Sequence, residues 1–538
     1  MADQTTTGTE WYKRAIIYAL QVQTFYDSND DGCGDFRGVI EKLDYLEELG
    51  VTCLWLLPFY KTATKDDGYD VVDHCAVDPR VGSEDDLRAL LDEAHRRGLR
   101  VIIELIVDHT SDQHEWFLRA KDPASAYRDY YIWSDVDRHG PEVSGSIFPG
   151  EEDGVWTFDE EAGAYYFHLF YKSEPSLNNA NPRVRQEIQH LIEHWSQLPI
   201  DGFRVDAASH ILQDKPEKTL RDESFVLLTE ICEAIKRDNP DRIAMAEADV
   251  DAEEYGKYFD SVQTMLNFLL SEYAFLGLAM ERSGPIRAIV EYLATARKDG
   301  GQFINFLRNV DELDMERLHQ EEQEVVNRAF APEADQRIYG RGIRRRLAPM
   351  LGGNQRRIEM AYSLLFSLPG TPLLFWGDEL GIGEDLSLPG RFAVRLPMPW
   401  SAELNGGFSR APRDKLLRPP VESGPYGFPT LNVEHQCRDP ASLPSFMKQL
   451  IHLRRANAWI GDARFEALSK DDSPVLVHRI HGGDASFTAV HNLSGMPQDV
   501  TLPNDRDTAS IIERGATLSL TPDATSLHLE PYGFVWLA

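Results

Sequence analysis

Cysteine is scarce in this sequence. Five cysteines, an odd number with no CxxC pair, occur in 538 residues. This excludes a disulfide framework and a zinc knuckle, and it predicts a protein of the reducing cytoplasm. Apolar runs of about 18 residues are also missing, which argues against a membrane span. No basic segment followed by an apolar one opens the chain, so no export signal is expected.

Positive charge is scarce as well. The chain has 55 Lys and Arg against 88 Asp and Glu, a formal net charge of −33. A surface of this sign repels phosphate backbones and anionic lipid headgroups, so nucleic acid and membrane partners are not expected. Neutral substrates or cations are expected instead.

The chain has enough apolar material for several structural units. Hydrophobic residues make up 42% of it, and the length predicts three or four units at roughly 150 residues each. Residues 83–98 predict a helix, with Ser83 as its N-cap and Gly98 as its stop. Helical patterns of this kind separate eight short apolar runs, which predict parallel strands: 15–20, 52–59, 100–107, 202–205, 242–247, 263–267, 303–307 and 372–376.

Eight such strands favour an α/β fold of the (β/α)8 TIM barrel type. An open doubly wound sheet is the alternative, but no GxGxxG follows the first strand. Residues 110–180 are too many for an ordinary βα loop and predict an inserted subdomain. Short alternating segments in 460–538 predict a C-terminal antiparallel β-sandwich. The barrel would then be formed by residues 1–109 and 181–459.

Three carboxylates, Asp206, Glu247 and Asp311, follow predicted barrel strands, where active sites of such barrels lie. Arg204 shares a strand face with Asp206, so its guanidinium is expected to keep Asp206 ionised as a nucleophile. Glu247 follows an apolar strand, where burial would raise its pKa and let it donate a proton. Asp311 is expected to hold sugar hydroxyls and stabilise developing positive charge. One ionised and one protonated carboxyl are typical of a glycosidase.

A loop near the N-terminus predicts a cation site. Oxygen donors occur at alternate positions around the turn-forming Gly32, as in an EF-hand loop, but Gly38 stands where a bidentate Glu is usual. Ca²⁺ is the expected ion, Mg²⁺ is the alternative, and a plain hydrated turn is the other interpretation. The expected donors are Asp27, Asn29, Asp31, the carbonyl of Cys33, and Asp35.

Four short motifs carry a family resemblance: ELIVDHTSD (104–112), GFRVDAASH (202–210), AEAD (246–249) and FLRNVDEL (306–313). They resemble those of the α-amylase family of glycoside hydrolases. Segments 27–38, 342–379 and 394–411 resemble the trehalose synthases within that family. The resemblance implies Asp206 as nucleophile, Glu247 as acid/base and Asp311 as transition-state stabiliser, with Ca²⁺ in the 27–35 loop. The substrate-binding residues it implies are Asp66, Tyr69, His109, Arg204 and Arg395.

The resemblance also implies a closed glucose site in which Arg395 is the partner of Asp66 and Tyr69 is a stacking platform. Departures from the family pattern occur at Val310, where a His is usual, and at Glu104 and Asp108, where Asp and Asn are commoner. Loss of the imidazole donor predicts activity that is weakened or directed to another substrate.

The function predicted from these features is retaining glucosyl transfer that interconverts maltose and trehalose through a covalent glucosyl-enzyme intermediate. One alternative is an α-glucosidase that hydrolyses trehalose, maltose or sucrose. Another is a catalytically weakened sugar-binding homologue, which is suggested by Val310 at the position of the usual His. No organic cofactor is expected, and a homo-oligomer is left open.

Overall fold

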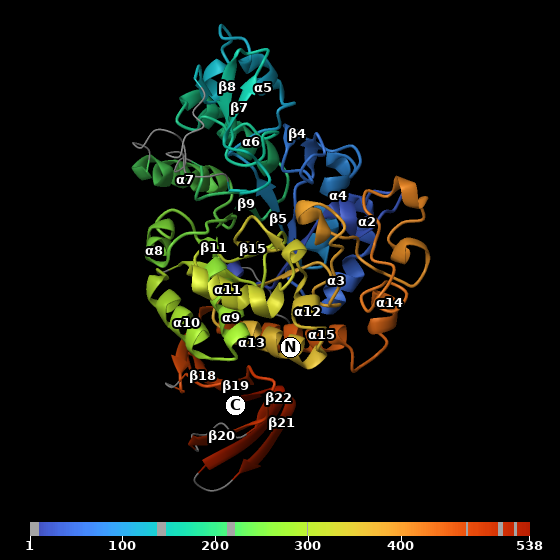
Figure 1. The fold of residues 1–538 in the computed structure, drawn as a ribbon, viewed down its shortest axis with the longest axis vertical. Helices are drawn as coiled ribbons and strands as arrows, with labels where there is room; N and C mark the ends of the chain where they lie inside the picture. The colour runs from blue at the N-terminus through green and yellow to red at the C-terminus, as the bar shows by residue number, and fades with distance from the viewer. Residues whose placement is uncertain are drawn as a thin grey trace.

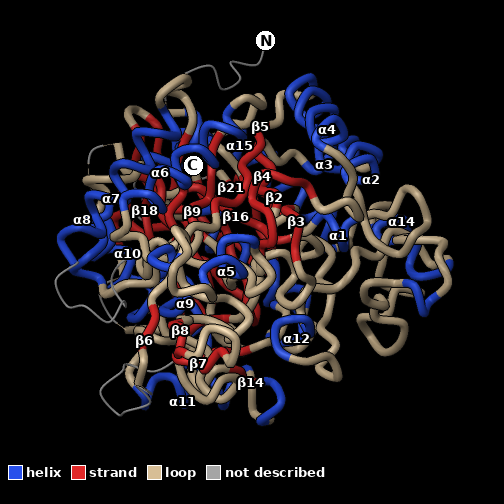
Figure 2. The backbone as a smooth tube through the Cα atoms, turned by 90° about the horizontal axis from the view of Figure 1, so that it is seen from above, coloured by secondary structure: helices blue, strands red, loops and turns tan. Residues whose placement is uncertain are grey.

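A computed structural model describes residues 10–136, 147–211, 221–298, 300–469, 472–503, 509–520 and 524–538. Eight parallel strands close a barrel in the order β1-β16-β12-β11-β10-β9-β5-β2, which confirms the expected TIM barrel. Figure 2 shows these strands at the centre of the molecule, with helices around them. The barrel strands are β1 (Ile17–Leu20), β2 (Cys53–Leu56), β5 (Arg100–Leu105), β9 (Gly202–Val205), β10 (Ile243–Ala246), β11 (Thr264–Leu266), β12 (Gln302–Asn305) and β16 (Thr371–Phe375).

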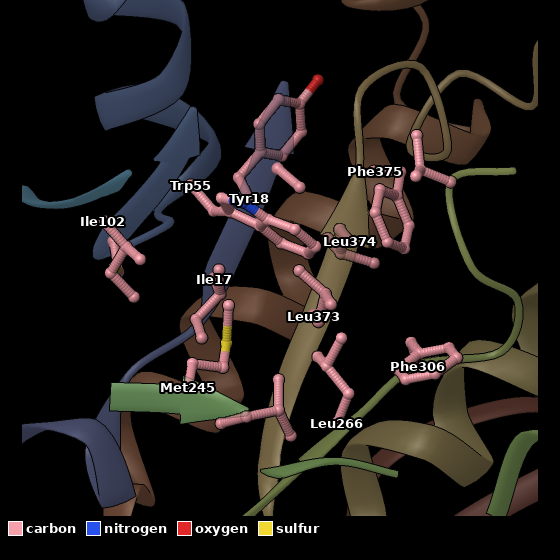
Figure 3. Close-up of a cluster of buried hydrophobic side chains, with 14 of the residues drawn as sticks. Ile17, Tyr18, Trp55, Ile102, Met245, Leu266, Phe306, Leu373, Leu374 and Phe375 are labelled. Carbon is pink, nitrogen blue, oxygen red and sulfur yellow. The ribbon is translucent and has the colours of Figure 1, made fainter. Parts of the chain in front are cut away.

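The interior of the barrel is filled by apolar side chains from successive strands. Tyr18, Trp55 and Phe375 lie together above Leu373 and Met245 (Figure 3), and all five are at most 2% exposed. Burial of such side chains stabilises the fold by about 1.5–3 kcal/mol each. The barrel interior is therefore packed with side chains, and an active site is expected at the carboxyl ends of the strands.

Helices follow the strands and cover the barrel from outside. The predicted helix at 83–98 is α4, in which Ser83 and Asp86 form a capping box. The helices are α1 (Val22–Phe25), α2 (Phe36–Glu41), α3 (Leu43–Leu49), α4 (Glu84–Arg96), α5 (Glu115–Ala120), α6 (Pro182–Ser196), α7 (Arg221–Lys236), α8 (Tyr255–Tyr258), α9 (Phe268–Met280), α10 (Gly284–Ala296), α11 (Gln320–Phe330), α12 (Leu347–Met350), α13 (Gln355–Ser367), α14 (Val433–Gln436) and α15 (Leu443–Ala456).

The segment between β5 and β9 projects from one end of the molecule (Figure 1). It carries an antiparallel sheet of β6 (Trp133–Ser134), β8 (Ala164–Phe167) and β7 (Trp156–Asp159). Two further small sheets lie among the barrel loops. They are formed by β3 (Tyr60–Thr62) with β4 (Val71–Val77), and by β13 (Leu313–Asp314), β15 (Gly342–Ile343) and β14 (Arg337–Ile338).

The C-terminal segment forms an antiparallel β domain at the opposite end (Figure 1). Its six strands are hydrogen-bonded into one sheet, in which β22 pairs with β19, β20 and β21. They are β17 (Arg464–Ala467), β18 (Val475–Gly482), β19 (Ala485–Asn492), β20 (Gln498–Pro503), β21 (Ser510–Leu520) and β22 (Ala524–Leu537). Within the described residues, no helix is long and apolar enough to cross a membrane.

Candidate active site

The three predicted catalytic carboxylates meet at the carboxyl end of the barrel. Asp206 directly follows β9 and Glu247 directly follows β10, its neighbour in the sheet. Asp311 lies in the loop after β12. All three line one pocket, and Asp206 and Asp311 are about 5% and 6% exposed. Because adjacent parallel strands end at the same edge, residues far apart in the sequence converge here.

Arg204 joins the two carboxylates that follow β9 and β10. Its Nη1 contacts Asp206, and its Nη2 lies 2.5 Å from Oε1 of Glu247. The same Nη1 donates to Oε2 of Glu104 at 2.8 Å. Glu104 is fully buried and also accepts from the indole of Trp55 at 3.0 Å. Glu104 therefore helps to fix the guanidinium, which in turn contacts both Asp206 and Glu247.

Burial raises the pKa of both Asp206 and Glu247, and Arg204 opposes the rise in each case. The raised pKa of Glu247 agrees with the prediction that it is a proton donor. For Asp206, Arg204 was expected to keep the carboxylate ionised; Arg204 does lower its pKa, but burial outweighs this effect and the pKa is raised. Burial also raises the pKa of Glu104 to about 8, again against the attraction of Arg204. One guanidinium thus serves three carboxyls, of which Glu104 and Asp206 are buried.

Ala207 has an unusual backbone conformation between the two carboxylates. Its φ is 46°, in the left-handed region that residues other than glycine rarely adopt. In this conformation its N–H donates to Oε2 of Glu247 at 3.0 Å, while the N–H of Ala208 donates to the Glu247 carbonyl at 2.7 Å. Backbone strain of this kind is common at functional sites, where the surrounding structure maintains it.

Two arginines that follow β16 face Asp311. Arg391 donates to Asp311 at 2.8 Å and to Asp66 at 2.5 Å. Arg395 donates through Nε to Asp311 at 2.6 Å and through Nη1 to Asp67 at 3.2 Å, but lies 3.8 Å from Asp66. The predicted ion pair of Arg395 with Asp66 is therefore present at 3.8 Å, but Arg391, which was not predicted, is the nearer partner of Asp66.

These arginines set the ionisation of the carboxylates beside them. Burial alone would raise the pKa of Asp311, but Arg391 and Arg395 outweigh it and lower the pKa. At Asp66 burial prevails over the same two cations and raises the pKa to about 6. Asp311 is thus an anion at neutral pH, suited to stabilising positive charge.

Seven of the eight predicted catalytic and substrate-binding residues line this pocket. Arg395 does not, because it is fully buried behind Asp311. The ring of Tyr69 lies under the Arg391 and Arg395 guanidiniums. Val310 is 1% exposed within the hydrophobic core and does not line the pocket, although Asn309 and Asp311 do. The pocket-lining residues that were predicted are Asp66, Tyr69, His109, Arg204, Asp206, Glu247 and Asp311.

Several residues that line the pocket were not predicted from the sequence. Arg391 precedes Arg395 by four residues in a segment without a periodic pattern, and only the folded chain places it at the pocket. Glu174 comes from the inserted segment and carries no motif. The remaining unpredicted lining residues include Phe148, Phe170, His210, Asp249, Glu312, Asp314 and Arg341.

The 27–35 loop has the chemistry of a site for a hard cation, because its predicted donors are all oxygens. Gly32 has a φ of 98°, which allows the sharp turn. Oδ1 and Oδ2 of Asp27 accept backbone N–H groups of Asp30 and Gly32, each at 2.8 Å. Oδ1 also accepts the N–H of Asn29 at 3.1 Å and Oδ2 also accepts the hydroxyl of Ser409, so these bonds orient the Asp27 carboxylate, and an ion there would have to share oxygens that already accept two hydrogen bonds each.

The loop also joins distant parts of the chain. Ser409 donates to Asp27 at 2.6 Å, and the N–H of Arg410 donates to Asp30 at 3.0 Å. Asp35 caps α2 through the N–H of Gly38 at 2.7 Å. The same oxygens that would hold an ion therefore fix the loop to the segment after β16.

A second acidic group lies beside the pocket. Oxygens of Asp249, Asp314 and Glu316 all lie within 4.8 Å of one another, and no other such group occurs among the described residues. Arg317 and Arg341 form ion pairs with these carboxylates at 2.9–3.4 Å. The positive charges of these two guanidiniums already neutralise carboxylate charge in the cluster, so we assign the cation site to the 27–35 loop and not to this cluster.

Comparison with known proteins places this barrel and its pocket in a family. The model "Alpha amylase, catalytic domain" matches residues 20–463. The chain belongs to the α-amylase family.

Individual relatives are more specific. A trehalose synthase of Thermus thermophilus is 42% identical over 92% of this chain, which spans only 51% of that relative's length. A trehalose synthase/amylase of Mycolicibacterium smegmatis is 37% identical over 92% of this chain and 86% of its own. The fold is shared with the crystal structure of a trehalulose synthase from Pseudomonas mesoacidophila. That structure is 23% identical with a TM-score of 0.80, covering 99% of this chain and 100% of the other.

Proposed function

We propose that this chain is a trehalose synthase that interconverts maltose and trehalose by retaining transfer of one glucosyl unit. The observation that carries the proposal is the convergence of Asp206 and Glu247 on one guanidinium, in a pocket that Asp311 also lines. Relatives named trehalose synthase, at 37% and 42% identity over 92% of the chain, support this choice of substrate.

The first half of the reaction follows from the positions of the carboxyls. An Asp206 oxygen attacks the anomeric carbon while the protonated Glu247 gives its proton to the glycosidic oxygen. The bond to the second glucose breaks, and a covalent glucosyl-Asp206 ester forms. Arg204 orients the nucleophile, and the anionic Asp311 stabilises the positive charge that develops on the sugar ring.

The second half determines the product. The released glucose turns within the pocket and attacks the anomeric carbon of the glucosyl-Asp206 ester through its own anomeric hydroxyl. Glu247, now ionised, takes the proton from that hydroxyl, Asp206 leaves as a carboxylate, and trehalose is formed. Attack by water instead would give two glucose molecules, so the enclosure of the pocket decides between transfer and hydrolysis.

Incubation with maltose in H₂¹⁸O tests this proposal. Glucosyl transfer gives trehalose without ¹⁸O, whereas hydrolysis gives glucose that carries it. Asp206→Asn is expected to lower kcat by at least ~10³-fold and to keep maltose binding, because the nucleophile is lost and the pocket is preserved. The matched control is Glu160→Gln in the exposed part of the inserted segment. Labelled glucose as the sole product would replace the proposal by α-glucosidase activity, and binding without turnover would replace it by a sugar-binding role.

The 27–35 loop is proposed to hold Ca²⁺, with Mg²⁺ as the alternative, in a structural role. The hard oxygen donors and the turn at Gly32 support this assignment. The ion would connect the loop to the segment near Ser409 and take no part in glucosyl transfer. A cytoplasmic location and a homo-oligomer remain predictions.

A further inference from the structure

Glu174 is a buried carboxyl that the glucosyl-transfer mechanism does not use. It belongs to the inserted segment, is 1% exposed and lines the catalytic pocket. Its Oε2 accepts the N–H of Tyr171 at 3.4 Å, but its Oε1 has no hydrogen-bond partner among the described residues. A buried polar atom without a partner is costly, so one that borders a ligand pocket indicates a missing ligand contact.

The position of Glu174 is fixed by the backbone around it. The N–H of Thr110 donates to the carbonyl of Pro175 at 3.2 Å, and Ser176 forms a β-bridge with His109. The N–H of Glu174 itself donates to the carbonyl of Tyr171 at 2.8 Å. The inserted segment is thereby tied to the end of β5, and Glu174 is presented at a defined place on the pocket wall.

The charges around Glu174 favour its neutral form. Asp66 and Asp70 face it from the loop before β4, and Arg391 faces it from the segment after β16. Burial, followed by the charge of Asp66, raises the pKa of Glu174 well above its usual value, while Arg391 opposes the rise. Arg391 is already bound to both Asp66 and Asp311. A carboxyl with a raised pKa keeps its proton to a higher pH than an ordinary glutamate does.

We propose that Glu174 is a substrate-binding residue that donates a hydrogen bond from its Oε1, unpartnered within the described part of the chain, to a glucose hydroxyl held between Asp66 and the inserted segment. A neutral carboxyl is both a donor and an acceptor, whereas the carboxylate of Asp66 only accepts. Together the two present complementary partners to a sugar, whose hydroxyls both donate and accept. The inference rests on the proposed function, because it takes an α-glucoside as the occupant.

The test measures binding without turnover. In an Asp206→Asn/Glu247→Gln background, neither catalytic carboxyl titrates or reacts, so maltose binding can be followed by calorimetry from pH 7.0 to 9.5. Adding Glu174→Gln, which keeps a donor, is expected to leave Kd at pH 7.0 within about twofold. Adding Glu174→Met, which has similar size and no donor, is expected to raise Kd about tenfold, which corresponds to a lost hydrogen bond of about 1.4 kcal/mol. Glu160→Gln serves as the exposed control.

Three results would overturn the proposal. One is a Glu174→Gln variant that binds as weakly as Glu174→Met, because a carboxylate acceptor would then be required. Another is a Glu174→Met variant that binds as tightly as the parent. The third is alkaline weakening of binding that is undiminished in Glu174→Gln, because another group, such as Glu104 with its pKa of about 8, would then account for all of it. These outcomes are independent of the proposed function, which stands or falls on the products formed from maltose by the unsubstituted chain.

Discussion

At the scale of single residues, the pocket is a network in which arginines are shared among carboxylates. Arg204 contacts Glu104, Asp206 and Glu247, and Arg391 contacts Asp66 and Asp311. The planar guanidinium can serve two carboxylates in fixed directions, whereas an ammonium cannot. The geometry of the pocket is therefore sensitive to exchange of Arg for Lys.

Arg391→Lys is expected to lower kcat/KM for maltose by about 10- to 100-fold. Lysine can reach Asp66 or Asp311 but cannot hold both in their present orientation, and a lost charge-assisted hydrogen bond costs about 1.5–3 kcal/mol. The fraction of glucose among the products should rise, because a looser pocket admits water. Steady-state kinetics with product chromatography measures both quantities. Arg438→Lys, at an exposed ion pair with Glu434, is the matched control, and equal kinetics of the two variants would reject a role for Arg391.

At the scale of elements, the sequence predicted those strands and helices that are encoded by a local pattern of residues. All eight barrel strands and helix α4 lie where apolar runs and the Ser83 cap predicted them. Asp206 and Glu247 could be found because they directly follow strands. The pairing of Arg391 with Asp66 spans 325 residues, and no local pattern encodes it. Val310 was expected to affect the sugar site, yet the backbone of its loop turns it into the core.

Another element contact joins α13 to the C-terminal sheet. His478 of β18 and His491 of β19 are fully buried with rings 5.7 Å apart and nearly parallel. They bond Ser367 and Ser363 of α13 at 3.0 and 2.9 Å. Burial lowers the pKa of His478 to about 3, and burial with the neighbouring His478 lowers that of His491 well below its usual value. Both rings are neutral in the folded chain.

This contact predicts acid sensitivity. An unfolded histidine takes up a proton near pH 6.5, while folded His478 does so only near pH 3. Its contribution to stability is therefore complete above pH 6.5 and decreases as the pH falls from there toward 3, by about 2 kcal/mol between pH 6.5 and 5. His478→Gln removes this titration, so its free energy of unfolding should fall less over that range. Denaturant unfolding at the two pH values checks this, with the exposed His190→Gln as control; parallel losses in both variants would contradict it.

At the scale of the whole molecule, the barrel is closed by contacts between its first and last strands, β1 and β16. The 27–35 loop follows β1 and bonds residues 408–410 after β16, so it reinforces this closure outside the sheet. In a molecule with a net charge of −33, a cation in this loop would also offset repulsion among the acidic residues there. A local loop thus affects the stability of the entire barrel.

Removal of bound Ca²⁺ is accordingly expected to lower the Tm of the whole chain. A ligand that binds only the folded state stabilises it by about 2.7 kcal/mol when its free concentration is 100 times Kd. Thermal unfolding in EDTA, and again after Ca²⁺ or Mg²⁺ is restored, measures the effect and identifies the ion. Asp31→Asn should abolish the change of Tm with Ca²⁺, because a neutral amide replaces an exposed carboxylate that would bind the ion. The amide oxygen can still accept the N–H of Cys33, which lies 2.9 Å from Asp31 in the unsubstituted chain. Asp92→Asn on the exposed side of α4 should respond like the parent. If Ca²⁺ raises the Tm of Asp31→Asn as much as that of Asp92→Asn, the ion lies elsewhere and the loop is a plain hydrogen-bonded turn.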